Sequence, residues 1–339
     1  MTYEDVLERA KQVLSPKCRV CRECNGIACK GEIPGVGAVG SGASFTDCRT
    51  YLKSIKLHMD AVHEHFEPDT TFQVFGKVLR APIMVAPIGG MSFNYTDYLT
   101  ETQYTQAIVN GALSAGILAF TGDGPKDDYF PSTLPVIEQA GGMAIPTIKP
   151  WEREKVLGRL REIAPYRCVA VAMDVDSAAL VNLKLQGKPA FTKSAPELAE
   201  FVREAKSPFI VKGVLTVPAA QRCVVAGAKA IVLSNHGGRI MEDAMPPVSV
   251  IRTIRDHVGS RIKIFVDGGI RSGADIFKCL ALGADAVLIG RPYAIAAHGG
   301  GEEGVRLLSE KLIGELKETM LMTDCKTLAD INREKIFQI

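Results

Sequence analysis

The sequence predicts an α/β protein in which eight strand–helix units close into a TIM (β/α)8 barrel. From residue 80 onward, short apolar runs alternate with helical stretches of about 10–18 residues. The runs are apolar at every position, a pattern typical of parallel strands that are buried on both faces. Eight such units are the number that closes a TIM barrel, and a doubly wound open sheet is the alternative. In either fold, functional side chains are expected at the carboxyl ends of the strands.

The predicted strands and helices follow one another from residue 82 to residue 289. The predicted strands are Pro82–Ala86, Ile117–Thr121, Met143–Ile148, Cys168–Val175, Pro208–Lys212, Ala230–Leu233, Ile262–Val266 and Ala286–Ile289. Helix-length stretches lie between them, among them Tyr98–Ser114, Glu152–Ile163, Ala195–Ala205, Val217–Ala226, Val248–His257 and Ala274–Leu282. We therefore assign residues 76–339 to the barrel and residues 1–75 to an N-terminal extension rich in cysteine and glycine.

The extension begins with a predicted amphipathic helix over residues 1–17 and then carries four closely spaced cysteines. Cys18, Cys21, Cys24 and Cys29 follow the pattern C-x2-C-x2-C-x4-C, and residues 31–45 form a glycine-rich loop. The spacing is close to the cysteine run that holds an iron–sulfur cluster in bacterial ferredoxins. Four thiolates also suit one zinc ion, and a set of free thiols is the third interpretation.

Composition excludes several classes of protein. The 339 residues are 47% hydrophobic and 23% charged, which is ordinary for a globular chain, and a net charge of +2 does not indicate a nucleic-acid partner. No apolar run reaches the 18 residues of a membrane span, and the N-terminus lacks the order of a signal peptide. We expect a cytoplasmic protein whose nine cysteines are reduced or bound to metal.

A histidine and an arginine follow the sixth predicted strand in the segment 234–239, which reads SNHGGR. His236 can exchange a proton near neutral pH, and Arg239 can hold a carboxylate through two parallel hydrogen bonds. The glycines between them let the backbone approach a ligand closely. The segment therefore predicts an acid/base group beside an anion site, and a strand-end turn with a structural histidine is the alternative.

Glycine-rich loops follow the seventh and eighth predicted strands. The first contains Asp267, Gly269 and Arg271, and the second contains Gly290 and Arg291. In a TIM barrel, these loops often bind phosphate through backbone N–H groups and helix N-termini. They predict a phosphate site, and the alternative is two tight turns that contain glycine.

Lys212 ends the fifth predicted strand after an apolar run. A lysine at this place is unfavourable unless it has a partner or reaches solvent. Three interpretations remain open, namely a Schiff-base nucleophile, a charge that stabilises an anion, and a solvated lysine at a strand end.

Taken together, four segments resemble the FMN-dependent 2-hydroxy-acid oxidase and dehydrogenase family, which includes glycolate oxidase and lactate oxidase. These segments are 210–213, 233–239, 266–273 and 280–292, and the segment 82–87 is a weaker match. The resemblance implies an FMN-binding TIM barrel that oxidises a 2-hydroxy acid to the 2-oxo acid, and a homo-oligomer that is often a tetramer.

The resemblance also implies a role for each matching residue. His236 would be the catalytic base, Asp176 would pair with it, and Arg239 would hold the substrate carboxylate. Lys212 would stabilise the anionic reduced flavin. The residues implied in FMN binding are Ala86, Pro87, Ile88, Thr121, Lys212, Ser234, Asp267, Gly269, Arg271, Gly290 and Arg291.

Three departures from the family pattern concern the substrate. Lys149 lies in a segment, PTIKP, where the family has a tyrosine that meets the substrate, and Asp174 stands where a neutral threonine is common. Residues 178–194 contain no counterpart of the second substrate arginine. Two alternatives therefore stay open, namely a non-redox FMN enzyme related to flavin-dependent isopentenyl diphosphate isomerase, and a redox sensor based on flavin or a cluster. The electron acceptor, whether oxygen, a quinone or a protein, is also open.

Overall fold

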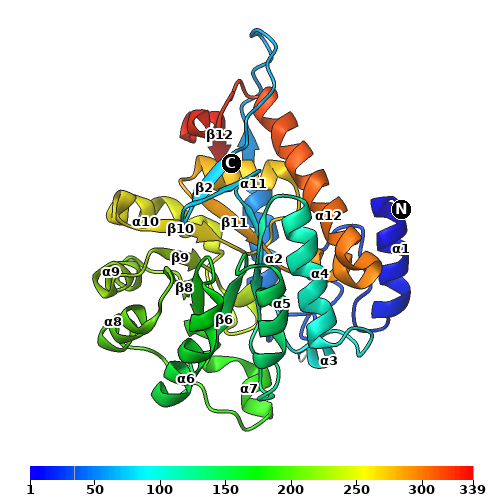
Figure 1. The fold of residues 1–339 in the computed structure, drawn as a ribbon. Helices are drawn as coiled ribbons and strands as arrows, with labels where there is room; N and C mark the ends of the chain where they lie inside the picture. Colours follow the sequence, from blue (N-terminus) through cyan, green and yellow to red (C-terminus); the bar gives the residue numbers. More distant parts are fainter. Residues whose placement is uncertain (34, 339) are drawn as a thin grey trace.

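A computed structural model describes residues 1–33 and 35–338, and at its centre is a closed barrel of parallel strands (Figure 1). Around the barrel, the strands follow the order β10, β11, β4, β5, β6, β7, β8 and β9. Their bounds are β4 Ile83–Val85, β5 Leu118–Thr121, β6 Ile145–Ile148, β7 Val171–Asp174, β8 Phe209–Val214, β9 Ala230–Leu233, β10 Lys263–Val266 and β11 Ala286–Ile289. The TIM barrel is confirmed, and the open sheet is wrong.

The strands are apolar throughout because both of their faces are buried. Met84, Phe120 and Phe265 belong to the cluster that fills the barrel interior, whereas Val211 and Ile231 pack outward among the helices. Since side chains alternate along a strand, Lys212 points to the same interior side as Ile210, two residues before it. The interior is thus apolar in the middle and becomes charged at the carboxyl end.

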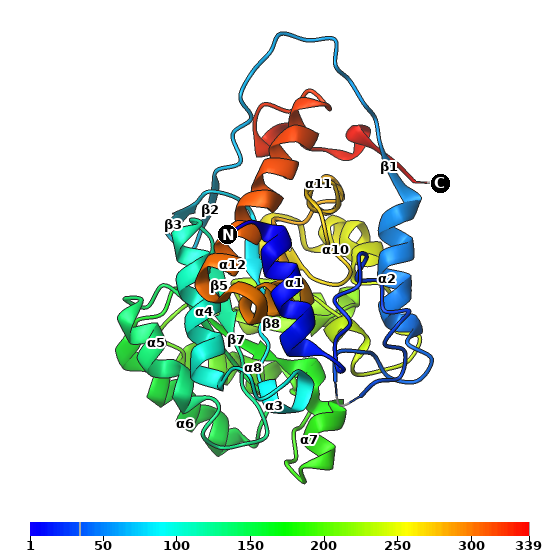
Figure 2. The same ribbon diagram turned by 90° about the vertical axis from the view of Figure 1, so that its right-hand side faces the viewer.

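Helices cover the outside of the barrel (Figures 1 and 2). The longer ones after β4 are α4 Glu101–Ser114, α5 Leu134–Gln139, α6 Arg153–Ile163, α8 Ala195–Glu204, α9 Val217–Ala226, α10 Ile251–Val258, α11 Gly273–Ala281 and α12 Arg291–Leu321. Two short helices, α3 Met91–Asn94 and α7 Val181–Leu185, lie in the loops that follow β4 and β7. These two loops therefore have enough length to reach over the carboxyl end of the barrel.

The N-terminal extension packs on the barrel through two helices. Helix α1, Tyr3–Leu14, lies along α12, where a Cβ added to Gly299 would be only 2.0 Å from the Val6 carbonyl oxygen (Figure 2). Helix α2, Ala43–Ser54, packs beside the SNHGGR turn, because the Asn235 amide donates to the Ser44 carbonyl at 3.0 Å. The extension thus supports the turn that carries His236.

Short strands complete the chain. Strand β1, Ile55–Leu57, pairs antiparallel with β12, Ile336–Gln338. Strands β2, Phe72–Val74, and β3, Lys77–Leu79, form a hairpin whose apolar residues join the interior cluster. Among the described helices, none is long and apolar enough to cross a membrane.

Candidate active site

A pocket lies at the carboxyl ends of the barrel strands. It has about 980 Å³ of free space, including the solvent at its mouth, and residues from most of the strand-end loops line it. Of the site residues expected from the sequence, those that line the pocket are Ala86, Pro87, Ile88, Lys212, His236, Arg239, Asp267, Gly269, Arg271, Gly290 and Arg291. Segments more than 200 residues apart in the chain thus meet at one place.

Three expected residues, Thr121, Ser234 and Asp176, lie behind the pocket wall. The Thr121 hydroxyl is fully buried and has no partner among the described residues. The Ser234 hydroxyl donates to the Asp267 carboxylate at 2.8 Å and accepts the His236 backbone N–H at 3.0 Å. Ser234 therefore connects the Asp267 carboxylate to the turn that carries the histidine.

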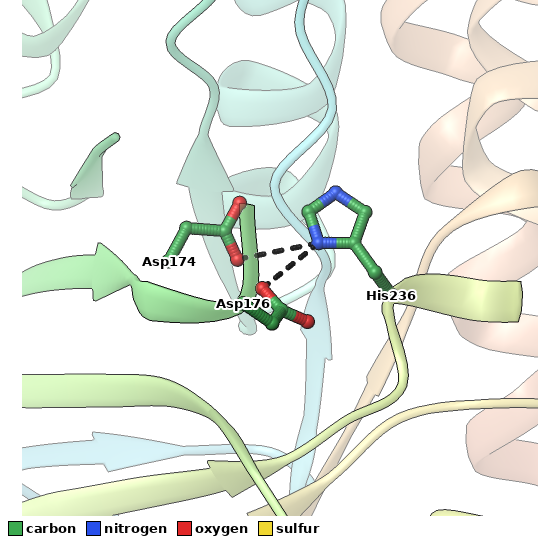
Figure 3. A group of neighbouring side chains, drawn as sticks. All are labelled: Asp174, Asp176 and His236. Atoms are coloured by element: carbon green, nitrogen blue, oxygen red, sulfur yellow. Dashed lines mark hydrogen bonds and ion pairs between the residues drawn. The ribbon is translucent and has the colours of Figure 1, made fainter. Parts of the chain in front are cut away.

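His236 is oriented by two carboxylates. Its Nδ1 lies 3.0 Å from Asp176 Oδ1 and 3.6 Å from Asp174 Oδ1, and Figure 3 shows the second ring nitrogen pointing away from both. When Nδ1 carries the hydrogen that Asp176 accepts, Nε2 has a free lone pair. The backbone of His236 is left-handed, with φ +57°, and this uncommon conformation turns the side chain toward the pocket that it lines.

Asp174 holds two lysines in a buried group at the base of the pocket. Lys149 Nζ lies 2.6 Å from Asp174 Oδ2, and Lys212 Nζ lies 2.9 Å from Asp174 Oδ1. Burial opposes ionisation of this carboxyl, but the charges of Lys149 and Lys212 overcome that effect and hold the pKa of Asp174 well below its usual range. Lys212 is 3% exposed, so its interpretation as a solvated strand-end lysine is wrong.

Asp174, Asp176 and His236 also lie close enough together to bind a metal ion. Their donor atoms lie within 4.8 Å of one another. However, both oxygens of Asp174 are already hydrogen-bonded to ammonium groups, and the positive charge of the two lysines opposes a cation there. We therefore interpret the group as an imidazole oriented by Asp176 beside an ion-paired carboxylate.

Two asparagines, not predicted from the sequence, lie beside Arg239, and one of them contacts it. The Arg239 guanidinium donates to Asn94 Oδ1, and the Asn182 amide donates to the same oxygen at 2.7 Å. Arg239 Nε and Asn182 Oδ1 have no partner among the described residues, although all three side chains line the pocket. Burial and the nearby charge of Arg291 lower the pKa of Arg239 to about 10, which leaves it charged at neutral pH.

These asparagines could not be recognised in the sequence because they lie in α3 and α7, in separate loops. Asn182 occupies the region after β7 where a second substrate arginine was expected and not found. The only indication in the sequence was that Asn182 is a polar residue in a loop after a barrel strand. Neighbouring residues share this property, so it did not identify Asn182 as a functional residue. Only the folded barrel brings it to Arg239.

A second carboxylate that sequence reasoning missed, Asp123, positions Lys149. Asp123 Oδ2 accepts the Lys149 backbone N–H at 3.0 Å and the Trp151 indole N–H at 2.7 Å. Burial raises the pKa of Asp123. Lys149, which departs from the family pattern, is thus held against the pocket at the end of β6.

The loop after β10 presents free backbone N–H groups. Gly268 and Gly269 have φ values of +99° and +82°, a region that favours glycine. Their N–H groups donate to no acceptor within residues 1–33 and 35–338. A Cβ on Gly269 would lie 2.9 Å from the Cys48 carbonyl carbon. This arrangement forms a concave anion site of the kind that binds phosphate.

Arg271 and Arg291, from the loops after β10 and β11, also tie the extension to the barrel. Arg271 Nε donates to the Cys24 carbonyl at 3.0 Å. Arg291 donates to the Val36 carbonyl at 2.7 Å and stacks on the Phe45 ring, 3.8 Å from its centroid. Both side chains line the pocket, so their charge adds to the free N–H groups. The residues present thus fit the phosphate of FMN, and the unpaired Asp267 Oδ1 is an acceptor for a ribityl hydroxyl.

The four N-terminal cysteines lie around a second cavity. Cys18, Cys21, Cys24 and Cys29 all line it. All nine cysteines of the chain are free thiols. The fold thus brings together the four cysteines that were considered as metal ligands.

Comparison with known proteins identifies the family. The family model described as FMN-dependent dehydrogenase matches residues 36–182 and 146–338. A 4-hydroxymandelate oxidase of Amycolatopsis orientalis is 30% identical over 330 residues, which cover 88% of this chain and 90% of that protein. An L-lactate oxidase of Roseobacter sp. (strain GAI101) is 40% identical over 150 residues, but this match covers only 44% of this chain and 40% of that protein.

Solved structures of mandelate oxidase have the same fold. One with (S)-2-phenylpropionate has a TM-score of 0.80 and 25% identity, and the match covers 98% of this chain and 97% of that chain. Another, which carries an FMN adduct, has a TM-score of 0.77, 25% identity and 97% coverage of both chains. These matches extend over nearly the whole chain, including the barrel and the pocket. The chain therefore belongs to the FMN-dependent dehydrogenase family.

Proposed function

We propose that this protein uses FMN to oxidise a 2-hydroxy acid to the 2-oxo acid, with His236 as the base. The observation that carries this proposal is the 3.0 Å contact between His236 Nδ1 and Asp176, which leaves the other ring nitrogen free beside the pocket. The similarity to a 4-hydroxymandelate oxidase supports the same class of substrate. FMN supplies the hydride-accepting chemistry when it is bound.

Each side chain then has one task. Arg239 binds the substrate carboxylate, Asn94 holds the guanidinium, and Asn182 in turn positions Asn94. His236 Nε2 accepts a proton from the substrate, and the Asp176 carboxylate stabilises the imidazolium that results. Lys212, kept charged by Asp174, stabilises negative charge on the flavin ring.

We propose that the residues after β4 would hold the flavin ring of FMN and that the loops after β10 and β11 would hold its phosphate. Ala86, Pro87 and Ile88 would line one face of the ring, with Thr121 and Ser234 near its polar edge. Asp267 would bind the ribityl chain. Gly269, Gly290, Arg271 and Arg291 would surround the phosphate. The free N–H groups of Gly268 and Gly269 support a phosphate-binding role for the loop after β10.

The decisive experiment is anaerobic mixing of FMN-loaded protein with a panel of 2-hydroxy acids while the flavin absorbance is followed. We expect bleaching by at least one acid. The His236→Gln variant should keep its FMN but bleach about 10²- to 10⁴-fold more slowly. His257→Gln, which changes an exposed histidine of α10, is the matched control and should behave like the parent protein.

The same experiment separates the alternatives. A relative of the diphosphate isomerase would turn over without net flavin reduction, and a sensor would bind FMN and respond to no hydroxy acid. Arg239 favours the hydroxy acid, because its Nε is unpaired and a planar guanidinium fits a carboxylate. Rapid bleaching in the His236→Gln variant would remove His236 from the role of base.

We further propose that the four N-terminal cysteines bind a metal, as zinc or as an iron–sulfur cluster, and that the protein is a cytoplasmic homo-oligomer. The common cavity of Cys18, Cys21, Cys24 and Cys29 supports the first statement. The resemblance to the family supports the oligomer. Metal analysis and analytical ultracentrifugation of the purified holoenzyme test both.

A further inference from the structure

The cysteine cavity is enclosed on one side by the barrel. Besides the four cysteines, Val36, Tyr95 and Ile295 line it, and Tyr95 is only 1% exposed. Cys18 is buried, Cys24 and Cys29 are half-buried, and Cys21 is exposed. The cavity therefore has an apolar, water-poor wall and one cysteine at the surface.

The segment around the cavity has little regular structure of its own. Between α1 and α2, no helix or strand forms in the described residues, and side chains provide much of the support. Arg19 donates to the Ala28 carbonyl at 2.6 Å, and Arg271 donates to the Cys24 carbonyl at 3.0 Å. Four thiols around one cavity in such a segment are typical of a site for a bound inorganic centre. Binding of such a centre stabilises a segment that has no large core of its own.

The cavity and the cysteine spacing bear on the choice between the two candidate centres. Zinc–sulfur bonds of about 2.3 Å place four tetrahedral thiolates about 3.8 Å from one another. Among the described residues, no three of these cysteine sulfurs all lie within 4.8 Å of one another, whereas Asp174, Asp176 and His236 do meet that limit. A cubane cluster needs wider spacing, since each thiolate binds a different iron atom around a central volume. The four cysteines line an open volume of about 440 Å³, including the solvent at its mouth, and their C-x2-C-x2-C-x4-C spacing is close to that of a ferredoxin cluster. Both observations suit a cluster better than a single zinc ion.

Positive charge surrounds the cavity. Arg271 Nη2 donates to Cys24 Sγ at 3.5 Å, and Arg291 lines the cavity. A cluster held by four thiolates is anionic and becomes more so when it gains an electron. Hydrogen bonds and cations at the sulfur atoms favour the reduced form and set the reduction potential.

The cavity and the flavin pocket share part of one wall. Tyr95 and Arg291 line both, and Arg271 lines the flavin pocket while it donates to Cys24. A single layer of side chains therefore separates the two sites. We propose that Cys18, Cys21, Cys24 and Cys29 bind a [4Fe–4S] cluster that receives electrons from the reduced flavin one at a time. The electron-transfer part of this proposal rests on the proposed function.

The electrons and protons balance with a one-electron carrier. Oxidation of one hydroxy acid to the oxo acid releases two electrons and two protons. The electrons leave in two single steps through the cysteine-bound cluster to two equivalents of a one-electron carrier protein whose reduction potential lies above that of the hydroxy acid. One proton leaves from His236 and the other from the flavin, both to solvent. The exposed Cys21 marks the side on which the carrier would dock.

The first test is the composition of the holoenzyme purified without air. We expect about four iron and four acid-labile sulfide atoms per chain, and an electron paramagnetic resonance signal after reduction with dithionite. Cys24→Ser should lose iron, sulfide and signal, yet keep FMN. Cys223→Ala, which changes a buried cysteine of α9 that lines neither cavity, is the control and should keep all of them. Zinc without sulfide, or no metal, would overturn the proposal.

The second test reduces the flavin with light instead of substrate, so that its result does not depend on the proposed function. In the parent protein, the cluster signal should appear as the flavin is reduced. In Cys24→Ser, the flavin should still be reduced, but transfer of electrons to cytochrome c, added as a one-electron acceptor, should fall by more than about tenfold. A cluster that stays oxidised beside reduced flavin would overturn the relay. If light reduces the cluster while no hydroxy acid bleaches the flavin, only the proposed function fails.

Discussion

Lys212 Nζ and Asp174 Oδ1 lie 2.9 Å apart at the carboxyl end of the barrel, and their side chains are 4% and 2% exposed. The two residues are register partners on β8 and β7, so the closed barrel itself places them together. A buried ion pair contributes little net stability, because desolvation offsets much of the attraction. Under the proposed function, the pair would keep Lys212 charged where it is to stabilise the flavin.

Asp174→Asn should destabilise the protein at neutral pH by about 3–5 kcal/mol, because two buried ammonium groups lose their partner. The pKa of Asp174 is held well below the usual 3.8 in the folded protein. Its stabilising effect is therefore fully present above about pH 4 and is lost only as pH falls through the lower folded value. When unfolding by urea is measured from pH 8 to pH 5, the difference in unfolding free energy between the parent protein and Asp174→Asn should stay constant. A difference that shrinks over this range would contradict the assignment.

Asp176→Asn should leave FMN bound and lower the rate of flavin reduction by about 10²- to 10⁴-fold. An amide orients the imidazole less well and does not stabilise the imidazolium. Stopped-flow measurement of flavin reduction over a range of pH tests this effect. The rate should fall, and the pH dependence of the rate should also shift. Asp127→Asn, at an exposed ion pair, is the control. A uniform loss of rate with an unchanged pH profile would indicate a structural role.

Arg239→Lys should raise the KM for a 2-hydroxy acid, and kcat/KM should fall about 10- to 100-fold, which corresponds to about 1.5–3 kcal/mol. A lysine cannot reproduce the planar, two-bond contact with a carboxylate. Steady-state kinetics with the acid and with its amide provide the comparison. The amide should be affected much less, and an equal loss for both would argue against a carboxylate contact at Arg239.

Gly269→Ala should weaken FMN binding by about tenfold or more, because the left-handed φ of +82° costs on the order of 1–3 kcal/mol for a residue with a Cβ. The added carbon would also approach the Cys48 backbone. Flavin titration of the apoprotein measures the affinity, and circular dichroism confirms folding. Gly158→Ala, in α6 with open space around it, is the control and should bind FMN normally. Unchanged affinity in the Gly269 variant would place the phosphate elsewhere.

Much of the fold followed from local patterns. Runs such as Ala230–Leu233 are apolar at every position, and a strand buried on both faces requires that pattern. The SNHGGR turn was recognisable because a histidine, two glycines and an arginine occur directly after such a run. The roles of His236 and Arg239 remain predictions, which the proposed kinetics will test.

The sequence by itself determined the strand and helix periodicity, the glycine loops after the last two strands and the close spacing of the four cysteines, since these are properties of neighbouring residues. Only the tertiary structure decided that Lys149 and Lys212 share one carboxylate, and that Arg239 and Asn182 donate to the same oxygen of Asn94. It also decided that the cysteine cavity adjoins the flavin pocket. Barrel closure sets these contacts between distant segments, and no local pattern along the chain encodes them.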